Sequence, residues 1–560
     1  MFHALRFVPR LQNAKMSSAP FDGNRRLPPL VNEPIRSYAP GSPERAALKS
    51  RLAAMEKECP EIPLVIGGKE IRTGDIEKAT SPHKHGHVTA TWHKARPEDV
   101  KAAIKSSAEA QRDWSTWRWE DRAAILLKAA ELLATTWRPT MAAATMLGQS
   151  KTAFQAEIDA TCELIDFWRL NVAFAGELYG EQPMSSQGMW NQTDLRGLEG
   201  FVYAVTPFNF TAIGGNLPTA PALMGGTSLW KPSNAAILSS WYTMKLLIEA
   251  GLPPGVVNFV PGDPIMISDI ALSHPDLGGI HFTGSTTVFQ SMWKTVGNNI
   301  SNYKSYPRIV GETGGKDFII AHASADVAGL ATAIVRGGFE YQGQKCSAAS
   351  RVYIPKSIWP EVRDRVIAMI KDIKVGDVNN FTNFMGAVID KRAHDRITGY
   401  LADGKKNAKI LAGGTANGET GWFVEPTLIQ TEDPAYRLLC EEIFGPVVTA
   451  YVYDDNKWAE TLKIVDSTSP YALTGAVFSR DRKAIHEAHA ALRNSAGNFY
   501  INDKPTGAIV GQQPFGGSRA SGTNDKAGSK MNLMRWASAR TVKETFVPAT
   551  EHHYPFMDAE

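Results

Sequence analysis

A single cysteine lies among small residues near the middle of the chain. Cys346 follows Gly343 and precedes Ser347 in the segment 335–354, VRGGFEYQGQKCSAASRVYI. Such a frame lets a substrate carbonyl approach the sulfur closely, because glycine permits backbone geometries that residues with a side chain do not. Free cysteine, however, is more often a small buried hydrophobe. The segment alone therefore leaves two interpretations open, a nucleophilic thiol in a loop and a packing residue.

Two other segments supply the further groups that are needed when an aldehyde is oxidised with a thiol as the nucleophile. Glu312 lies in the glycine-rich sequence GETGGK, 34 positions before Cys346. Asn209 lies in TPFNF, directly after the strand-like segment 201–205, and α/β sheets bind their ligands at strand ends. Thiol, side-chain amide and carboxylate can act as nucleophile, oxyanion donor and general base.

Seven motifs in order make the chain resemble the aldehyde dehydrogenase superfamily, which uses NAD(P). They run from Pro207 to Lys526 and read PFNFTAIGG, WKPS, FTGS, GETGGK, GQKCSA, EEIFGPV and GQQPFGGSRASGTNDK. The last motif, which begins at Gly511, is similar to that of the Δ1-pyrroline-5-carboxylate (glutamate-γ-semialdehyde) dehydrogenases of proline catabolism. This resemblance implies an α/β protein with a Rossmann-like NAD-binding domain, an α/β catalytic domain and a small oligomerisation flap.

The resemblance also implies a reaction, the NAD-dependent oxidation of L-glutamate γ-semialdehyde to L-glutamate. Cys346 is then expected to form a thiohemiacetal and a thioester, with Asn209 in the oxyanion hole and Glu312 activating the hydrolytic water. One alternative is a dehydrogenase of another semialdehyde, or one with coenzyme A as acyl acceptor, although Glu312 favours water. Another is a non-enzymatic structural protein on the same fold, against which the three intact groups argue.

Seven residues are expected, by the same resemblance, to hold NAD: Lys231, Ser233, Gly262, Gly284, Ser285, Glu442 and Phe444. The first three are expected at the adenosine, the next two near the pyrophosphate and the last two at the nicotinamide and its ribose. No GxGxxG fingerprint follows the first strand-like segment, which fits this family's different mode of NAD binding. Asn234 stands where many NAD-specific relatives have Glu, so it would not repel the 2'-phosphate of NADP. We therefore expect a preference for NAD with NADP tolerated.

Five residues are expected at the substrate. Relatives sandwich the aliphatic carbons between Phe210 and Phe515, and they hold the α-carboxylate with Ser347 and the backbone amides of Gly507 and Ala508. Some relatives have Ser at the last position, whereas Ala508 offers only its backbone N–H.

Composition excludes several classes of protein. The 560 residues are 43% hydrophobic and 21% charged, with a net charge of +3 and no basic stripe that would suggest nucleic acid. No apolar run of about 18 residues suggests a membrane span. Four cysteines without CxxC spacing indicate a reducing compartment without disulfides or a zinc site, and His83, His85 and His87 are interpreted as part of a solvated loop.

The N-terminal segment 1–21 has the composition of a mitochondrial presequence. It contains basic and apolar residues, and no acidic residue occurs before Asp22. An N-terminal tail without function has the same composition, but eukaryotic members of the family work in the mitochondrial matrix, which is therefore the expected location.

Alternating elements predict how these groups are positioned. Helices are predicted from Pro97 and over 121–137, and β-rich segments at 201–205, 228–231, 256–260 and 279–283 predict βαβ units with a parallel sheet. We predict an NAD-binding domain over 40–183 and 200–311, a catalytic domain over 312–528, and oligomerisation segments at 184–199 and 529–560. Segment 541–547 alternates like an edge strand, which relatives use in a neighbouring subunit, so a homodimer or larger assembly is expected. Whether proline dehydrogenase is a physical partner is left open by the sequence.

Overall fold

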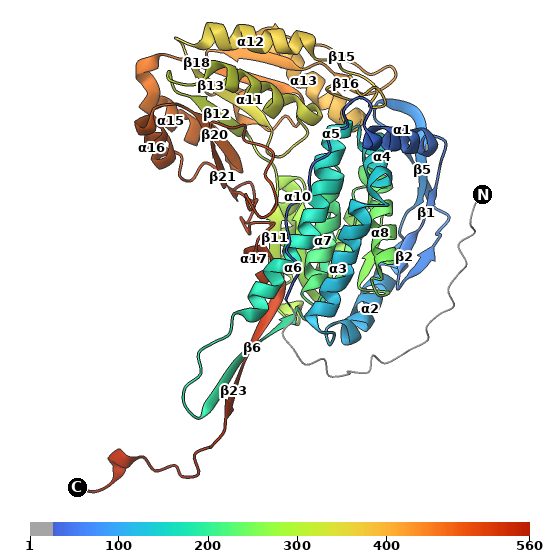
Figure 1. Cartoon of the computed structure of the whole chain (residues 1–560), viewed down its shortest axis with the longest axis vertical. Helices are drawn as coiled ribbons and strands as arrows, with labels where there is room; N and C mark the ends of the chain where they lie inside the picture. Colours follow the sequence, from blue (N-terminus) through green and yellow to red (C-terminus); the bar gives the residue numbers. More distant parts are fainter. Residues whose placement is uncertain (1–25) are drawn as a thin grey trace.

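Two lobes, each built on a seven-stranded sheet covered by helices, make up the body of the molecule (Figure 1). The computed structural model describes residues 26–560, so the expected presequence over 1–21 lies outside the described residues. The chain passes from the first sheet to the second between Glu312 and Asp317, where β11 ends and β12 begins.

The first sheet has the strand order β11-β10-β7-β8-β9-β2-β3. Its five parallel strands are β7 (Phe201–Val205), β8 (Thr227–Lys231), β9 (Val257–Phe259), β10 (Leu277–Thr283) and β11 (Arg308–Glu312). At the edge, β2 (Leu64–Ile66) runs antiparallel to β9, and β3 (Lys69–Ile71) antiparallel to β2. The predicted parallel sheet is confirmed. Because parallel strands share a direction, all five carboxyl ends lie along one edge.

Helices cover this sheet on both faces. They are α2 (Pro97–Trp114), α3 (Trp119–Ala134), α4 (Arg138–Gln149), α5 (Ala153–Ala156), α6 (Leu164–Gly180), α7 (Thr211–Leu223), α8 (Ile237–Ala250), α9 (Pro264–Ser273) and α10 (Thr286–Asn298). A π-helical segment, Glu157–Glu163, joins α5 to α6. Both predicted helices are confirmed, as α2 and α3. Fully buried Trp168 and Trp230 belong to the core between the helices and the sheet.

The second sheet has the order β14-β17-β18-β13-β12-β20-β21. Its strands are β12 (Asp317–Ala321), β13 (Ala349–Pro355), β14 (Lys409–Ala412), β17 (Thr427–Thr431), β18 (Val447–Tyr453), β20 (Thr474–Phe478) and β21 (Asn498–Ile501), and only β14 is antiparallel to its neighbour. The helices of this lobe are α11 (Val327–Phe339), α12 (Trp359–Asp372), α13 (Lys391–Asn407), α14 (Arg437–Cys440), α15 (Trp458–Ser467) and α16 (Arg482–Ala491).

A small sheet near the N-terminus corrects one prediction. It comprises β1 (Glu61–Ile62), β5 (Lys84–His93) and β4 (Ile76–Ser81), and α1 (Pro43–Met55) precedes it. The solvated loop predicted for His83, His85 and His87 is wrong, because the last two belong to β5 and His83 is buried with Nδ1 3.1 Å from Ser150 Oγ. The backbone N–H of His85 donates to the Thr420 carbonyl, so this hairpin contacts the second lobe. Within residues 26–560, no group of three or more His, Cys, Asp or Glu side chains could hold a metal ion.

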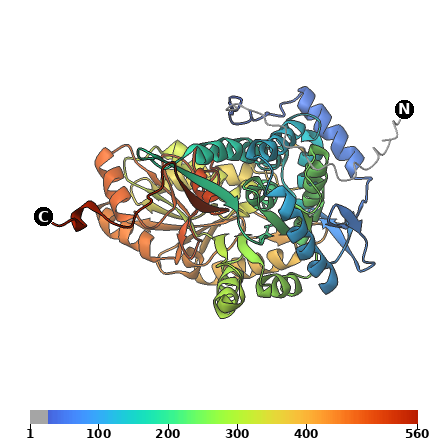
Figure 2. The same ribbon diagram turned by 90° about the horizontal axis from the view of Figure 1, so that it is seen from below.

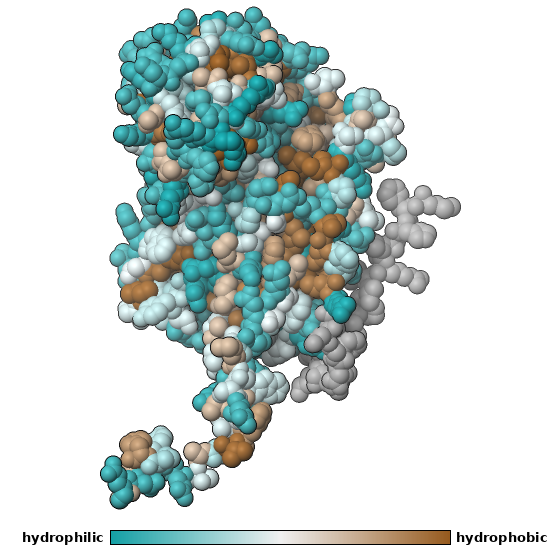
Figure 3. Space-filling model, turned by 60° about the vertical axis from the view of Figure 1, so that its left-hand side comes forward, coloured by the Kyte–Doolittle hydropathy of each residue, from teal (hydrophilic) through white to brown (hydrophobic). Residues whose placement is uncertain are grey.

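A two-stranded arm projects from the body (Figure 1). In it β6 (Met189–Gly197) pairs antiparallel with β23 (Ala537–Thr545), which α17 (Lys530–Met534) precedes. The strand predicted at 541–547 is thus confirmed as far as Thr545, and the tail beyond it extends away from both lobes (Figure 2). Apolar side chains are exposed in this region (Figure 3), among them Trp190, Phe546 and Val547. No helix among the described residues is long and apolar enough to cross a bilayer.

Candidate active site

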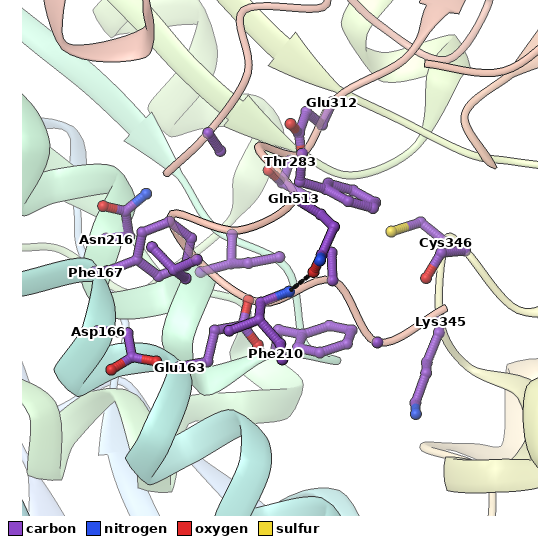
Figure 4. A pocket seen from close by; sticks show the side chains of 18 of the residues that line it. Glu163, Asp166, Phe167, Phe210, Asn216, Thr283, Glu312, Lys345, Cys346 and Gln513 are labelled. Atoms are coloured by element: carbon purple, nitrogen blue, oxygen red, sulfur yellow. Dashed lines mark hydrogen bonds between the residues drawn. The ribbon is translucent and has the colours of Figure 1, made fainter. Parts of the chain in front are cut away.

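One cavity of about 380 Å³ collects side chains from both lobes (Figure 4). Seven of the predicted site residues line it: Glu312, Cys346, Phe210, Ser347, Gly507, Ala508 and Phe515. In Figure 4 the Cys346 sulfur points into the cavity from one wall, and Glu163 and Asp166 lie on the opposite side. The structure thus brings the expected nucleophile, base and substrate residues into one space.

The loop that presents Cys346 is held in an unusual backbone conformation. It follows a 3-10 turn, Glu340–Gly343, in which Tyr341 and Gln342 have φ values of 51° and 57°. Side chains disfavour this left-handed region, so other contacts must hold it. The Gln342 amide does so, because it donates to the carbonyls of Ser150 and Ala387. Gly337 and Gly338 precede this turn and belong to α11.

The surroundings of Cys346 keep its thiol protonated. Burial raises the pKa of Cys346 well above its ordinary value, and the negative charges of Glu312, Asp317 and Glu442 raise it further. A thiolate is the reactive form, so ionisation here requires added positive charge or a base that takes the proton. The thiol is half-buried, and the cavity gives access to it.

Glu312 is the last residue of β11, at the carboxyl edge of the first sheet. Burial raises the pKa of its carboxyl to about 8, with Lys526 opposing the shift and Asp525 adding to it. A carboxyl that ionises near pH 8 can take a proton from water at a pH close to neutrality. The carboxylate is therefore suited to the role of general base.

The Asn209 side chain contacts the loop that carries Cys346 and is not among the residues that line the cavity. It is buried in the turn between β7 and α7, and its Nδ2 donates to the Gln344 carbonyl at 3.0 Å, two residues before Cys346. An amide nitrogen carries two N–H groups, so one is left to donate to an oxygen beside the sulfur. Asp159 fixes this turn, because its carboxylate accepts from the backbone N–H groups of Thr211 and Ala212.

The expected carboxylate anchor lies in the segment 506–513, which we call the anchor loop. Ser347 Oγ lies 2.8 Å from Thr506 Oγ1, which ties the loop to the cysteine segment. Gly507 has φ of 95°, a conformation that disfavours other residues. The Lys151 ammonium lies over the Phe210 ring, 4.2 Å from the ring centroid.

The residues expected to hold the adenosine half of NAD follow successive strands of the first sheet. Lys231 ends β8, Gly262 follows β9, and Gly284 with Ser285 follows β10. The Ser285 side chain caps α10 by accepting from the Val288 N–H at 3.4 Å, and a helix N-terminus is suited to a phosphate. Burial lowers the pKa of Lys231 to about 8.

An unpaired acceptor fits a ribose at this edge. Asn234 Nδ2 donates to the Gly262 carbonyl at 3.0 Å, whereas its Oδ1 is buried without a hydrogen-bond partner in the described part of the chain. Buried polar atoms are nearly always hydrogen-bonded, so we expect a donor from a bound molecule, such as a ribose hydroxyl, to bind this oxygen. Ser233, the N-cap of the short turn Asn234–Ala236, lies beside it.

Glu442 and Phe444 connect the two lobes. Glu442 Oε1 accepts from the Gly315 N–H at 2.8 Å, and a Cβ on Gly314 would lie 2.3 Å from Oε2, so any other residue there would displace this carboxylate. Burial raises the pKa of Glu442 to about 7. Phe444 has φ of 53°, and its ring packs edge-on against Phe208 at 5.8 Å.

The charged groups that sequence reasoning missed include Glu163, which lines the cavity, and Lys526, which lies near Glu312. Glu163 lines the cavity from the π-helical segment, and its side chain has no hydrogen bond or ion pair among residues 26–560. No motif marks it. Lys526 Nζ donates to the carbonyls of Gly497 and Gly516 and faces Glu312, and its place as the last residue of the closing motif was the available signal.

Comparisons with known proteins agree with this geometry. Residues 72–542 match the model of the aldehyde dehydrogenase family. The mitochondrial delta-1-pyrroline-5-carboxylate dehydrogenase of Dictyostelium discoideum is 53% identical, over 95% of this chain and 96% of its own length. The NAD-bound crystal structure of the enzyme of that name from Mycobacterium tuberculosis has a TM-score of 0.93 at 50% identity, covering 96% of this chain and 100% of its own. An NAD-bound Thermus 1-pyrroline-5-carboxylate dehydrogenase structure has a TM-score of 0.87 at 31% identity, covering 93% and 100%.

The expected resemblance and fold are therefore confirmed. The match extends over most of the chain and includes both lobes and the arm, since β6 and most of β23 lie within the matched residues. The chain belongs to the aldehyde dehydrogenase family.

Proposed function

We propose that this enzyme oxidises L-glutamate γ-semialdehyde, the open form of Δ1-pyrroline-5-carboxylate, to L-glutamate with NAD, the second step of proline catabolism. The observation that carries the proposal is a single cavity lined by Cys346, Glu312 and the anchor loop. Relatives at about half identity carry the matching name, and two NAD-bound structures of that name share the fold.

The chemistry is divided among three side chains. After the Cys346 thiol has lost its proton to a base, the thiolate attacks the aldehyde carbon. The alkoxide oxygen then accepts from the Asn209 amide and the Cys346 backbone N–H, each worth about 3 to 4 kcal/mol in the transition state. Bound NAD supplies the hydride acceptor. Glu312 takes a proton from water as the water oxygen attacks the resulting thioester, and cleavage of the C–S bond releases glutamate and the thiolate.

Substrate selectivity is assigned to the two ends of the cavity. Ser347 and the backbone amides of Gly507 and Ala508 hold the α-carboxylate, and Phe210 with Phe515 encloses the aliphatic carbons. The α-ammonium group needs an anion. Glu312, which also lines the cavity, is assigned to the hydrolytic water. The remaining cavity carboxylates have partners: Asp166 accepts from Asn32, Glu33 pairs with Arg138 and Arg169, Glu340 pairs with Lys345, and Asp525 pairs with Arg535. Glu163 is the remaining cavity carboxyl, without a hydrogen bond or ion pair among residues 26–560. Burial and the neighbouring Asp159 raise its pKa well above the ordinary value, and an ammonium beside it would favour the ionised form, so we assign the ammonium to Glu163.

The cofactor preference follows from Asn234. Its buried Oδ1 lacks a donor, and the 2'-hydroxyl of NAD can supply one. Because the side chain is neutral, a 2'-phosphate meets no charge repulsion there, and NADP is tolerated at lower efficiency. The nicotinamide half is assigned to Glu442 and Phe444, and the pyrophosphate to Gly284 and Ser285.

We also propose where this enzyme resides and that it forms an oligomer. Mitochondrial relatives and the acid-poor segment 1–21 support residence in the mitochondrial matrix. The arm of β6 and β23, with its exposed apolar side chains, supports a homodimer or larger assembly. Within one chain most of β23 is exposed, and a second copy of the chain would cover it.

The test is formation of NADH from pyrroline-5-carboxylate, compared with succinate semialdehyde, adipate semialdehyde and propanal. The proposal expects the highest kcat/KM for glutamate γ-semialdehyde. A higher value for another semialdehyde would reassign the substrate within the same chemistry. Failure to bind NAD would instead support a non-enzymatic role.

A further inference from the structure

The segment 32–38, here called the N-terminal strap, lies against the helices that back the cavity. The Glu33 N–H donates to Asp166 Oδ1 at 2.7 Å, and the Arg36 N–H donates to Glu157 Oε1 at 2.9 Å. The Tyr38 hydroxyl donates to the other Glu157 oxygen at 2.8 Å. Asn32, Glu33 and Ile35 line the cavity itself. The strap is therefore part of the cavity wall, although it lies far from the catalytic motifs in sequence.

Asn32 joins this strap to the anchor loop. Its Nδ2 donates to Asp166 Oδ2 at 2.8 Å and to the Val510 carbonyl at 2.9 Å. Its Oδ1 accepts from Gln512 Nε2 at 2.9 Å. Three of the four hydrogen bonds open to an asparagine side chain are thus formed, and two of them end on the anchor loop. A bond to a carboxylate is stronger than one between neutral groups, so α6 provides a firm attachment through Asp166.

The anchor loop has few other attachments at this end. Gln513 Oε1 accepts from the Ile509 N–H at 3.0 Å, the bond drawn dashed in Figure 4, and this closes a turn within the loop. Gly511, with φ of 81°, lies against α6, where an added Cβ would be 2.8 Å from Leu170 Cδ1. These contacts shape the turn, whereas Asn32 attaches it to Asp166. Val510 is only two residues after Ala508, so its carbonyl and the carboxylate-binding amides move together.

We propose that Asn32 is a positioning residue for the substrate carboxylate: by joining Val510 and Gln512 to Asp166, it sets where the amides of Gly507 and Ala508 meet that carboxylate. This rests on the proposed function, which assigns the carboxylate to those amides. Loss of the Asn32 side chain leaves the thiol, Asn209 and Glu312 in place. Its effect is therefore on binding of carboxylate-bearing aldehydes and not on the chemical steps.

The test is a comparison of two aldehydes in the full-length chain. Asn32→Ala is expected to raise KM for glutamate γ-semialdehyde about tenfold, with kcat within about twofold of wild type. For propanal, which has no carboxylate, both KM and kcat are expected to stay within about twofold. Gln512→Ala removes one of the two hydrogen bonds between Asn32 and the anchor loop and leaves the bond to the Val510 carbonyl. It should raise KM for glutamate γ-semialdehyde by a smaller factor than Asn32→Ala does.

Val31→Ala is the matched control, because Val31 precedes Asn32 in the chain and is 67% exposed. It should leave all constants unchanged. Equal effects of Asn32→Ala on the two aldehydes, or no effect on either, would overturn the proposal. If Asn32→Ala does not fold, Gln512→Ala becomes the test of the proposal. An unchanged KM of Gln512→Ala for the semialdehyde would contradict the proposal. A wild-type enzyme that oxidises propanal but not the semialdehyde would refute the proposed function instead, and is recognised without any variant.

Discussion

The raised pKa of Glu312 predicts how turnover depends on pH. With a pKa of about 8, its carboxyl is ionised in about one-tenth of molecules at pH 7 and in about nine-tenths at pH 9. Only the ionised form can take the proton from the hydrolytic water. If thioester hydrolysis limits turnover, its rate should therefore rise about tenfold between these pH values. Because a reduced nicotinamide carries no charge, we expect the pKa to stay near this value at the hydrolytic step.

Stopped-flow measurement with propanal separates this step from the earlier ones, and propanal does not cyclise as glutamate γ-semialdehyde does. The burst of NADH reports attack and hydride loss, and the later linear phase reports hydrolysis. Glu312→Gln should keep a burst of about one equivalent, since Cys346 and Asn209 are intact. Its linear phase should be slowed about 10² to 10⁴-fold and lose the tenfold pH rise. The same pH rise in Glu312→Gln, or loss of the burst without a stalled acyl-enzyme, would refute the assignment of the base.

The raised pKa of Glu312 also predicts how the thermal stability of Glu312→Gln differs from that of wild type at different pH values. A carboxyl whose pKa rises from 4.5 to about 8 on folding holds its proton more tightly in the folded chain. Its contribution to stability is full below about pH 4.5 and declines as pH rises toward 8. Glu312→Gln cannot ionise, so its Tm relative to wild type should be higher at pH 9 than at pH 5. An equal difference at both pH values would contradict the raised pKa.

Three further predictions address the other assignments. Asn209→Ala should lower kcat about 10² to 10³-fold, the loss typical of one oxyanion donor, with the burst slowed in pre-steady-state traces; an unslowed burst would remove Asn209 from the oxyanion hole. Asn234→Glu should lower kcat/KM with NADP at least about tenfold while changing that with NAD little, because the new carboxylate repels the 2'-phosphate; a wild-type kcat/KM with NADP that equals or exceeds that with NAD would reject the stated preference. Removal of residues 537–560 should convert a dimer or larger assembly into a monomer in light scattering, and a wild-type monomer would contradict the role given to the arm.

Residues that belong to motifs were predictable because seven ordered motifs resemble those of a family in which these positions have assigned roles. The sequence predicts Cys346, Glu312, Phe210, Gly507 and Ala508 at the site, and the structure brings them to one cavity. The parallel strands were also predictable, since short β-rich segments alternated with helices. Their carboxyl ends then placed Lys231, Gly262, Gly284 and Ser285, expected at the adenosine and pyrophosphate, along a single edge.

What the sequence could not reveal depends on contacts between distant segments. Glu163 lies in a helical stretch without a motif, and only tertiary packing turns its carboxyl toward the cavity. Asn32 is 478 positions from Val510, whose carbonyl it holds, so no local pattern relates them. His83 was expected in solvent, but the hairpin that carries it packs against both lobes and buries it. Local composition describes a segment's own preferences, and these three positions are decided by their neighbours.

Peptide mass spectrometry of Glu312→Gln, quenched after mixing with NAD and glutamate γ-semialdehyde, tests the central assignment most directly. We predict the mass of a glutamyl thioester on the peptide that contains Cys346, and no adduct at the exposed Cys59. An unmodified Cys346 peptide in enzyme that has formed one equivalent of NADH would contradict the account.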